Sequence, residues 1–263
     1  MGTDKDWEKW GATDPYFGVL SSEQFRADKI NKSVKDQFFD SGKRHVKRVI
    51  ETIREHFDPK FSPISALDFG CGVGRLVIPL AGLANEVVGV DVSPSMLSEA
   101  AKNCELANVR NVTFIQLKDL SNVTGQFDLV HSYIVFQHIS WIRGRILIQT
   151  LSERVQPGGY IAIHVFTSCN APKLIRALVR LRYIFPPFNW LRNIAKGRPA
   201  FEPAMQLHTY DLSTIKSDLV ARNFKIPLCI DEPTGSEFTS TLLFALRMPP
   251  NDSFKPMPLH GVT

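Results

Sequence analysis

Long apolar runs and paired cysteines are missing from this sequence of 263 residues. Nowhere do about 18 consecutive apolar residues occur, the minimum for a membrane-spanning helix. The first ten residues, MGTDKDWEKW, are charged where a signal peptide needs an apolar run. The four cysteines are far apart, so their spacing indicates neither a zinc site nor a disulfide framework. We therefore expect a soluble, cytoplasmic protein.

Acidic residues are missing from one stretch of the chain. Seven basic residues and no acidic residue occur from Lys173 to Arg198. The charge of this segment therefore exceeds the net charge of +5 for the whole chain. A local positive surface is compatible with an anionic partner such as nucleic acid, although a basic stripe more often faces solvent. The charge alone therefore does not identify a partner.

Short apolar runs alternate with helical patterns over most of the chain, whose 44% hydrophobic residues can form the core of one elaborated domain. Strand-like runs occupy residues 65–70, 86–91, 112–117, 127–133 and 159–166. Continuous apolar strands separated by helices predict a mainly parallel sheet that is covered on both faces. Two later runs, at 224–230 and 240–248, have no helix between them, so we expect an antiparallel hairpin at one edge.

A helical pattern precedes the first strand. Its apolar residues at three- and four-residue spacing are Val46, Val49, Ile50, Ile53 and Phe57. Ser41 is the expected amino-terminal cap of this helix and Pro59 its expected stop. The pattern predicts an amphipathic helix that leads into the core.

A glycine-rich turn follows the first strand, in the stretch ALDFGCGVGRLVIPL at residues 66–80. Gly70, Gly72 and Gly74 have the spacing G-x-G-x-G, whereas dinucleotide-binding proteins have G-x-G-x-x-G. Asp91 closes the second strand and can accept two hydrogen bonds from a ribose in either class of protein. The turn therefore indicates a nucleotide site, and its spacing argues against an oxidoreductase that uses NAD.

Four motifs resemble, in order, those of class I S-adenosylmethionine-dependent methyltransferases: LDFGCGVGR, VVGVDVSPSML, FDLVHS and VQPGGYIAIHVF. The resemblance implies an α/β fold, with a Rossmann-like seven-stranded mostly parallel sheet, an antiparallel edge hairpin and helices on both faces. We accordingly divide the chain into an N-terminal helical extension (1–60), a methyltransferase domain (61–248) with an inserted lid (168–210), and a flexible tail (249–263).

The resemblance also implies that S-adenosyl-L-methionine lies across the carboxyl ends of the first, second and fourth strands. Asp68 would support the turn and the amino group, and Asp91 would accept from the ribose hydroxyls. In the family, a Gly-Asp pair commonly follows the third strand directly, and its Asp accepts from the adenine amino group. This pair is absent here, and we assign the role to Asp119. The predicted cofactor-binding residues are Asp68, Gly70, Gly72, Gly74, Asp91, Val92, Met96, Asp119, Leu120, Ser132 and Tyr133.

The segment HSYIVFQHIS, at residues 131–140, faces the transferred methyl group in the family that it resembles. We predict that His138 is the catalytic base because imidazole titrates near neutral pH, while the alternative is that it only orients the next helix. His164 lies in an apolar strand and is interpreted as a core histidine. Because the segment contains no acidic residue, we predict no metal site.

Two other segments leave their role open. Trp7, Trp10, Tyr16 and Phe17 either close the pocket or pack on the outside of the core helix. From Lys173 onward, apolar residues repeat at helical spacing opposite basic ones, which predicts an amphipathic basic helix. Three roles for this helix are open. Its apolar face could cover the pocket, its basic face could bind an anionic acceptor, or the helix could rest on an anionic membrane surface.

The function predicted from the motifs is an S-adenosylmethionine-dependent methyltransferase. Its expected acceptor is a small molecule, by O-methylation of a sugar-containing or secondary-metabolite substrate. The alternative is an RNA or other nucleic-acid methyltransferase that uses the basic segment 173–198, where Tyr183, Phe188 and Trp190 are available for stacking on bases. A non-catalytic subunit with the same fold is a weaker hypothesis because the cofactor motif is intact.

Overall fold

Seven strands of the described residues, 3–234 and 237–250, form one mixed sheet in the order β3-β2-β1-β4-β5-β7-β6 in the computed structural model. Strands β1 to β5 pair in parallel, and β7 runs antiparallel to both of its neighbours. The strands are β1 (Ser65–Phe69), β2 (Glu86–Asp91), β3 (Val112–Gln116), β4 (Phe127–Ser132), β5 (Val155–Cys169), β6 (Leu228–Thr234) and β7 (Phe238–Leu246). The predicted Rossmann-like sheet with an antiparallel edge hairpin is confirmed.

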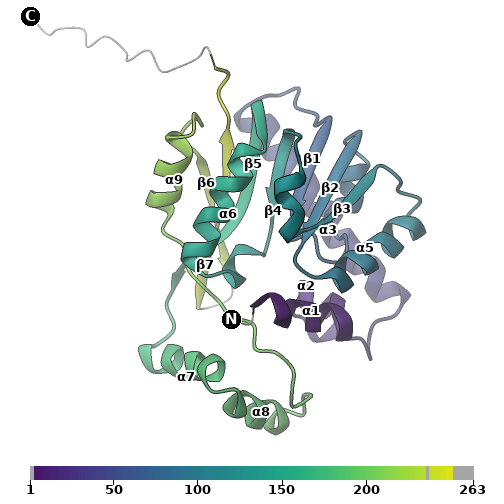
Figure 1. The fold of residues 1–263 in the computed structure, drawn as a ribbon, viewed down its shortest axis with the longest axis vertical. Helices are drawn as coiled ribbons and strands as arrows, with labels where there is room; N and C mark the ends of the chain where they lie inside the picture. The colour runs from purple at the N-terminus through teal and green to yellow at the C-terminus, as the bar shows by residue number, and fades with distance from the viewer. Residues whose placement is uncertain (1–2, 235–236, 251–263) are drawn as a thin grey trace, which may run out of the picture.

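Helices cover both faces of this sheet (Figure 1). On one face lie α3 (Lys32–His56), α4 (Val77–Ala81) and α5 (Pro94–Leu106), and on the other α6 (Trp141–Glu153) and α9 (Leu212–Val220). Successive side chains of a strand point to opposite faces of the sheet, so Ala66 packs in the core on the α3 side and Leu67 in the core on the α6 side. Burial of both faces explains why the central strands are apolar throughout.

The long helix α3 begins earlier than its apolar pattern predicted. Asn31 is the amino-terminal cap, because its side chain accepts a hydrogen bond from the Val34 N–H at 3.1 Å. The predicted cap at Ser41 is wrong: this residue lies inside the helix, where its hydroxyl donates to the Phe38 carbonyl at 2.6 Å. The first turns of α3 pack on the amino-terminal segment and not on the sheet, so the sheet-facing pattern does not extend to them.

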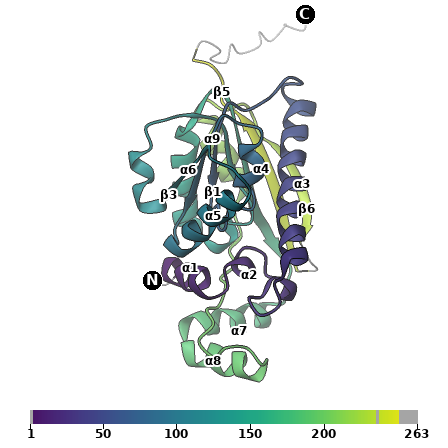
Figure 2. The same ribbon diagram turned by 90° about the vertical axis from the view of Figure 1, so that its right-hand side faces the viewer.

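Two amino-terminal helices, α1 (Thr3–Thr13) and α2 (Pro15–Val19), lie across the carboxyl ends of the parallel strands (Figures 1 and 2). Trp10, Tyr16 and Phe17 are buried there with Phe38 of α3. Of the two roles considered for these three aromatic residues, closing the pocket or packing, the structure shows packing. A short 3-10 turn (Glu23–Phe25) then leads to α3.

The helices α7 (Lys173–Ile184) and α8 (Pro186–Ala195) project from the sheet beyond α1 and α2 (Figure 2). Within the described ranges, no helix is long and apolar enough to span a membrane. Short 3-10 turns follow β3 (Leu117–Asn122) and β4 (Phe136–His138). The predicted tail, 249–263, lies outside the described residues except at its first two positions.

Candidate active site

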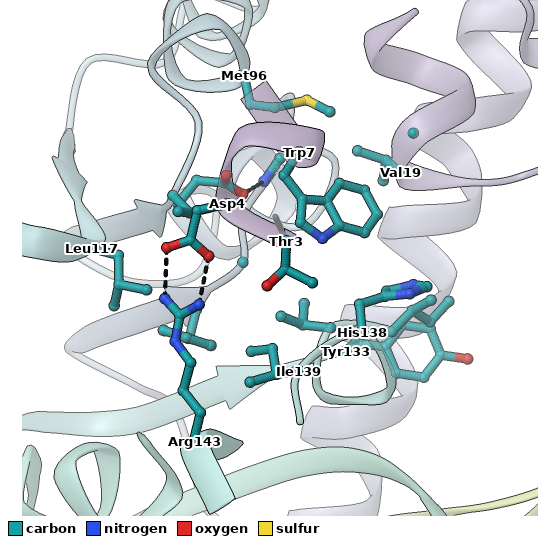
Figure 3. Close-up of a pocket in the computed structure, with 18 residues that line it drawn as sticks. Thr3, Asp4, Trp7, Val19, Met96, Leu117, Tyr133, His138, Ile139 and Arg143 are labelled. Atoms are coloured by element: carbon teal, nitrogen blue, oxygen red, sulfur yellow. Dashed lines mark hydrogen bonds and ion pairs between the residues drawn. The ribbon is translucent and has the colours of Figure 1, made fainter. Parts of the chain in front are cut away.

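A cavity lies at the carboxyl ends of the parallel strands, beside the point where the strand order reverses between β1 and β4. Its empty space, including the open mouth, is about 750 Å³. The lining comes from the strand ends, the start of α5 and the amino-terminal helices (Figure 3). The residues that line it are Thr3, Asp4, Trp7, Gly18, Val19, Phe69, Gly70, Gly72, Asp91, Val92, Met96, Leu117, Tyr133, Ile134, Val135, His138, Ile139 and Arg143.

The turn after β1 has a backbone that requires glycine. Gly70 and Gly72 have φ angles of +75° and +52°, in the left-handed region that side chains disfavour. A Cβ on Gly70 would lie 2.3 Å from a methyl carbon of Val135, and one on Gly72 would lie 2.5 Å from a methyl carbon of Val19. Both glycines therefore let the turn fit between the loop after β4 and helix α2.

Asp91 is held in a fixed orientation at the end of β2. Its Oδ2 accepts from the Gly72 N–H and its Oδ1 accepts from the Ser93 N–H, both at 2.9 Å. Burial raises the pKa of this carboxyl group to about 6, although the backbone hydrogen bonds act in the opposite direction. Each oxygen keeps acceptor capacity for a further hydrogen bond from a molecule in the cavity.

Asp68 lies behind the cavity and has a partner that the sequence did not indicate. Its Oδ1 is 2.8 Å from Nδ1 of His131, and Nε2 of His131 is 3.0 Å from Nε2 of His45. The other carboxylate oxygen, Oδ2, is buried and has no hydrogen-bond partner within residues 3–234 and 237–250. Asp68 therefore orients a histidine with one oxygen and keeps the second available.

A buried polar cluster supports Tyr133 at the back of the cavity. The ring of His45 stacks on Tyr133 with 3.6 Å between centroids, and His164 approaches it edge-on at 4.8 Å. Arg75 lies 5.9 Å from the Tyr133 ring, and burial lowers the pKa of its guanidinium to about 10. His164 is buried as predicted, and burial lowers its pKa to about 4. These contacts fix Tyr133 as a wall of the cavity.

Six of the eleven predicted cofactor-binding residues line the cavity: Gly70, Gly72, Asp91, Val92, Met96 and Tyr133. The other five are Asp68, Gly74, Asp119, Leu120 and Ser132, which lie outside its lining. Ser132 donates through its hydroxyl to the Phe69 carbonyl at 2.9 Å, which ties β4 to β1. Leu120 is buried in the core on the α6 side. The cofactor roles of these five residues stay predictions.

His138, the predicted base, lines the cavity from the 3-10 turn after β4. Its Nδ1 is 2.8 Å from the Gln206 carbonyl oxygen, which can only accept, so Nδ1 carries the proton. Trp7 packs edge-on against the ring with 4.9 Å between centroids (Figure 3). Burial lowers the pKa of His138 to about 4, so the imidazole is neutral and Nε2 carries a lone pair.

The sequence did not indicate the residues that hold α1 over the cavity. Arg143 of α6 donates two hydrogen bonds to Asp4, at 2.5 and 2.8 Å (Figure 3). Glu8 accepts from the hydroxyls of Ser93 and Ser95 at the start of α5, at 2.7 and 2.6 Å. The described part of the predicted lid, 168–210, contributes no lining residue, whereas α1 contributes three. A lid role for 168–210 stays a prediction.

A family model described as a methyltransferase domain matches residues 66–159. Among curated proteins, ribosomal protein L11 methyltransferase of Burkholderia multivorans is 34% identical over 121 residues, which are 46% of this chain and 37% of that protein. The chain thus spans little more than a third of the length of this relative. The match to the family model covers the glycine turn and the strands from β1 to the start of β5.

Two solved structures resemble the whole fold. Magnesium protoporphyrin IX methyltransferase from Synechocystis PCC 6803, with bound SAH, has a TM-score of 0.59 and 21% identity, over 91% of this chain and 97% of its own. N-methyltransferase NodS from Bradyrhizobium japonicum WM9, in complex with S-adenosylhomocysteine, has a TM-score of 0.56 and 13% identity, over 94% and 99%. These structures and the family model confirm the resemblance that the motifs carried.

The steric role of Gly70 predicts a loss of stability on substitution by alanine. Gly158 has a similar φ of +83°, but a Cβ on it would have no other atom within 4 Å, so Gly158→Ala is the matched control for backbone strain. We expect Gly70→Ala to lower the free energy of unfolding by about 1 to 3 kcal/mol more than Gly158→Ala does, because of overpacking against Val135. Equal losses in urea unfolding would contradict this role.

Proposed function

We propose that this chain, whose residues 66–159 match the family model of a methyltransferase domain, is an S-adenosylmethionine-dependent methyltransferase that transfers a methyl group to a hydroxyl of a small-molecule acceptor. One observation carries the proposal. A neutral histidine, His138, lines the same cavity as the glycine turn and Asp91. A nucleotide-binding end and a proton-accepting side chain are thus combined in one cavity.

The residues of the cavity fit S-adenosylmethionine. Both oxygens of Asp91 are oriented by backbone N–H groups and can accept from the two ribose hydroxyls. Val92 and Met96 line the cavity beside it and suit the apolar faces of an adenine. Behind this lining, Oδ2 of Asp68 is buried and has no hydrogen-bond partner in the described part of the chain, and we assign it to the ammonium group of the methionine portion.

In the proposed reaction, His138 acts on the acceptor side. Bound S-adenosylmethionine would supply an electrophilic methyl carbon on a positively charged sulfur, and S-adenosylhomocysteine would be the leaving group when the acceptor oxygen takes the methyl. Nε2 of His138 takes the hydroxyl proton, while Nδ1–H stays bonded to the Gln206 carbonyl. That carbonyl fixes the orientation of the ring and stabilises the positive charge that the proton brings.

The remaining lining favours a small acceptor with an apolar body. Five apolar side chains line the cavity together with His138: Trp7, Val19, Ile134, Val135 and Ile139. A secondary metabolite fits these side chains better than an unsubstituted sugar, because few of them can satisfy buried hydroxyls. Methylation of RNA or another nucleic acid is the alternative. That alternative depends on the basic segment 173–198, which contributes no residue to the cavity lining within the described part of the chain.

The pKa of about 6 at Asp91 predicts that cofactor affinity depends on pH. Ribose hydroxyls donate to the ionised carboxylate, so binding lowers its pKa and releases a proton wherever the free site is protonated. Calorimetric titration should therefore find constant S-adenosylmethionine affinity above about pH 7 and an affinity that falls, by up to about tenfold per pH unit, below about pH 6.

Two variants of Asp91 separate its charge from its hydrogen bonds. Asp91→Ala should weaken S-adenosylmethionine binding about 10- to 150-fold at neutral pH, since it removes hydrogen bonds to a charged group. Asp91→Asn should bind independently of pH in the acid range. An acid limb that persists in Asp91→Asn would assign the titration to a different group, and unchanged affinity in Asp91→Ala would contradict the cofactor assignment.

The proposed base predicts a large effect on turnover at His138. His138→Asn can keep the hydrogen bond to the Gln206 carbonyl through its amide N–H but has no basic nitrogen. We expect its turnover to fall about 100-fold while its S-adenosylmethionine affinity stays unchanged. Turnover is measured as release of S-adenosylhomocysteine with a screening panel of phenols and alcohols. At saturating S-adenosylmethionine, wild-type turnover should fall only below about pH 4, where His138 becomes protonated and can no longer accept.

His56 is the matched control for this substitution. It is exposed in the last turn of α3 and does not line the cavity, so His56→Asn should keep wild-type turnover. Equal turnover in wild type and His138→Asn would make His138 a structural residue. Turnover with RNA but with no small molecule of the panel would overturn the proposed acceptor class.

A further inference from the structure

The helix pair α7–α8 turns polar side chains toward the rest of the chain. Asn189 and Asn193, one turn apart on α8, are 5% and 2% exposed. Both donate through their side-chain amides to the Glu202 carbonyl, at 3.0 Å. The hydroxyl of Tyr183 on α7 donates to the Met205 carbonyl at 2.7 Å. The inner contacts of this pair are thus largely hydrogen bonds to the backbone of the segment that follows it.

The opposite faces of these helices are apolar and uncovered. Of the 19 large hydrophobic residues that are exposed in the described chain, 11 lie between residues 174 and 201. They are Leu174, Ile175, Leu178, Leu181, Ile184, Phe185, Phe188, Trp190, Leu191, Ile194 and Phe201. Leu191 and Ile194 are 68% and 61% exposed and lie across α8 from the two buried asparagines. So many exposed apolar side chains on two adjacent helices indicate that another body covers them.

The same two helices are also positively charged. Residues 173–198 contain no acidic side chain. Arg176, Arg180, Arg192 and Lys196 make no ion pair with any residue that the structure describes, although Arg198 pairs with Glu23 at 2.8 Å. Their four charges are therefore available to an external anionic group.

We propose that α7 and α8 are a docking surface for an anionic lipid bilayer. Short helices with an apolar face and long basic side chains on their other sides suit the interface of a bilayer, where apolar groups enter the acyl region and cations reach lipid phosphates. Trp190 and Phe188, which are 39% and 36% exposed, have the aromatic side chains that favour this depth. Neither helix is long enough to cross the bilayer, so the contact is interfacial.

Two other occupants fit the surface less well. A nucleic acid would neutralise the basic residues but would leave aliphatic side chains such as Leu191 and Ile194 in water. A second copy of the chain would cover the aliphatic residues but would bring two basic segments together without acidic partners. Only an anionic lipid surface complements both properties.

The attachment of the helix pair brings this surface close to the cavity. Glu202, just after α8, pairs with Arg26 of the amino-terminal segment at 2.6 Å. Lys9 of α1 donates to the Phe201 carbonyl, and a few residues further on, just beyond Met205, the Gln206 carbonyl accepts from His138. Figure 2 shows α7 and α8 next to α1 and α2, the helices that cap the cavity, so a bilayer that holds α7 and α8 would lie on this side of the molecule.

Co-sedimentation with vesicles tests the proposal. The full chain should sediment with vesicles of equimolar phosphatidylcholine and phosphatidylglycerol, remain in solution with phosphatidylcholine alone, and dissociate as ionic strength rises. The double variant Arg176→Gln and Arg180→Gln should partition about 30-fold less, because two charges near the lipid surface are lost. The double variant Leu191→Gln and Ile194→Gln should partition at least about tenfold less.

Matched variants control for charge and apolarity elsewhere. Lys43→Gln with Arg44→Gln removes two charges from exposed positions of α3, and Ile142→Gln with Ile146→Gln removes two exposed apolar residues of α6. Both pairs should sediment like wild type, and all variants should keep wild-type S-adenosylmethionine affinity, which does not depend on the lipid surface. Partitioning that the α7 and α8 variants leave unchanged, or that is equal for neutral vesicles, would overturn the proposal.

Two further outcomes would assign the surface to another occupant and overturn the lipid proposal. The first is binding to single-stranded RNA that the Arg176 and Arg180 substitutions abolish, without vesicle binding. The second is a dimer, measured by light scattering, that the Leu191 and Ile194 substitutions dissociate.

Discussion

The connection between the turn after β1 and the end of β2 positions most of the candidate site. The N–H of Gly70 donates to the Val90 carbonyl at 2.7 Å, and that of Gly72 donates to Asp91 at 2.9 Å. These bonds close the turn tightly and orient the Asp91 carboxylate at the same time. Because a parallel sheet aligns the ends of its strands, the turn, Asp91 and the loop with His138 meet at one edge.

The amino-terminal cap depends on how closely it can approach this turn and the start of α5. A Cβ on Gly11 would lie 2.4 Å from the Ser93 hydroxyl, so the glycine allows α1 to rest on the first turn of α5. Glu8 then accepts from Ser93 and Ser95, where the helix terminus favours a negative charge. The cap is thus joined to the element that follows Asp91, and movement of one affects the other.

The parts of the fold that sequence patterns predicted are those that local residues determine. The alternation of strands with helices, the glycine turn and the position of Asp91 at the end of a strand depend on residues close together in the chain. Each of them lies where it was expected. The contacts that were missed join distant segments: Asp68 with His131, Glu8 with Ser95, and Arg143 with Asp4. Each of these residues is an ordinary charged or polar residue in its own segment. Only the assembled fold gives them partners.

The burial that makes His138 a weak base is compatible with the role proposed for it. With a pKa of about 4, His138 cannot remove a proton from a free alcohol to any useful extent. As the methyl carbon bonds to the acceptor oxygen, however, that oxygen gains positive charge and its proton becomes strongly acidic. A weak base is then sufficient, and its low pKa keeps it unprotonated over the whole physiological range. The burial of the ring, which packs against Trp7, therefore keeps it neutral, and the bond to the Gln206 carbonyl keeps it oriented until the acceptor needs it.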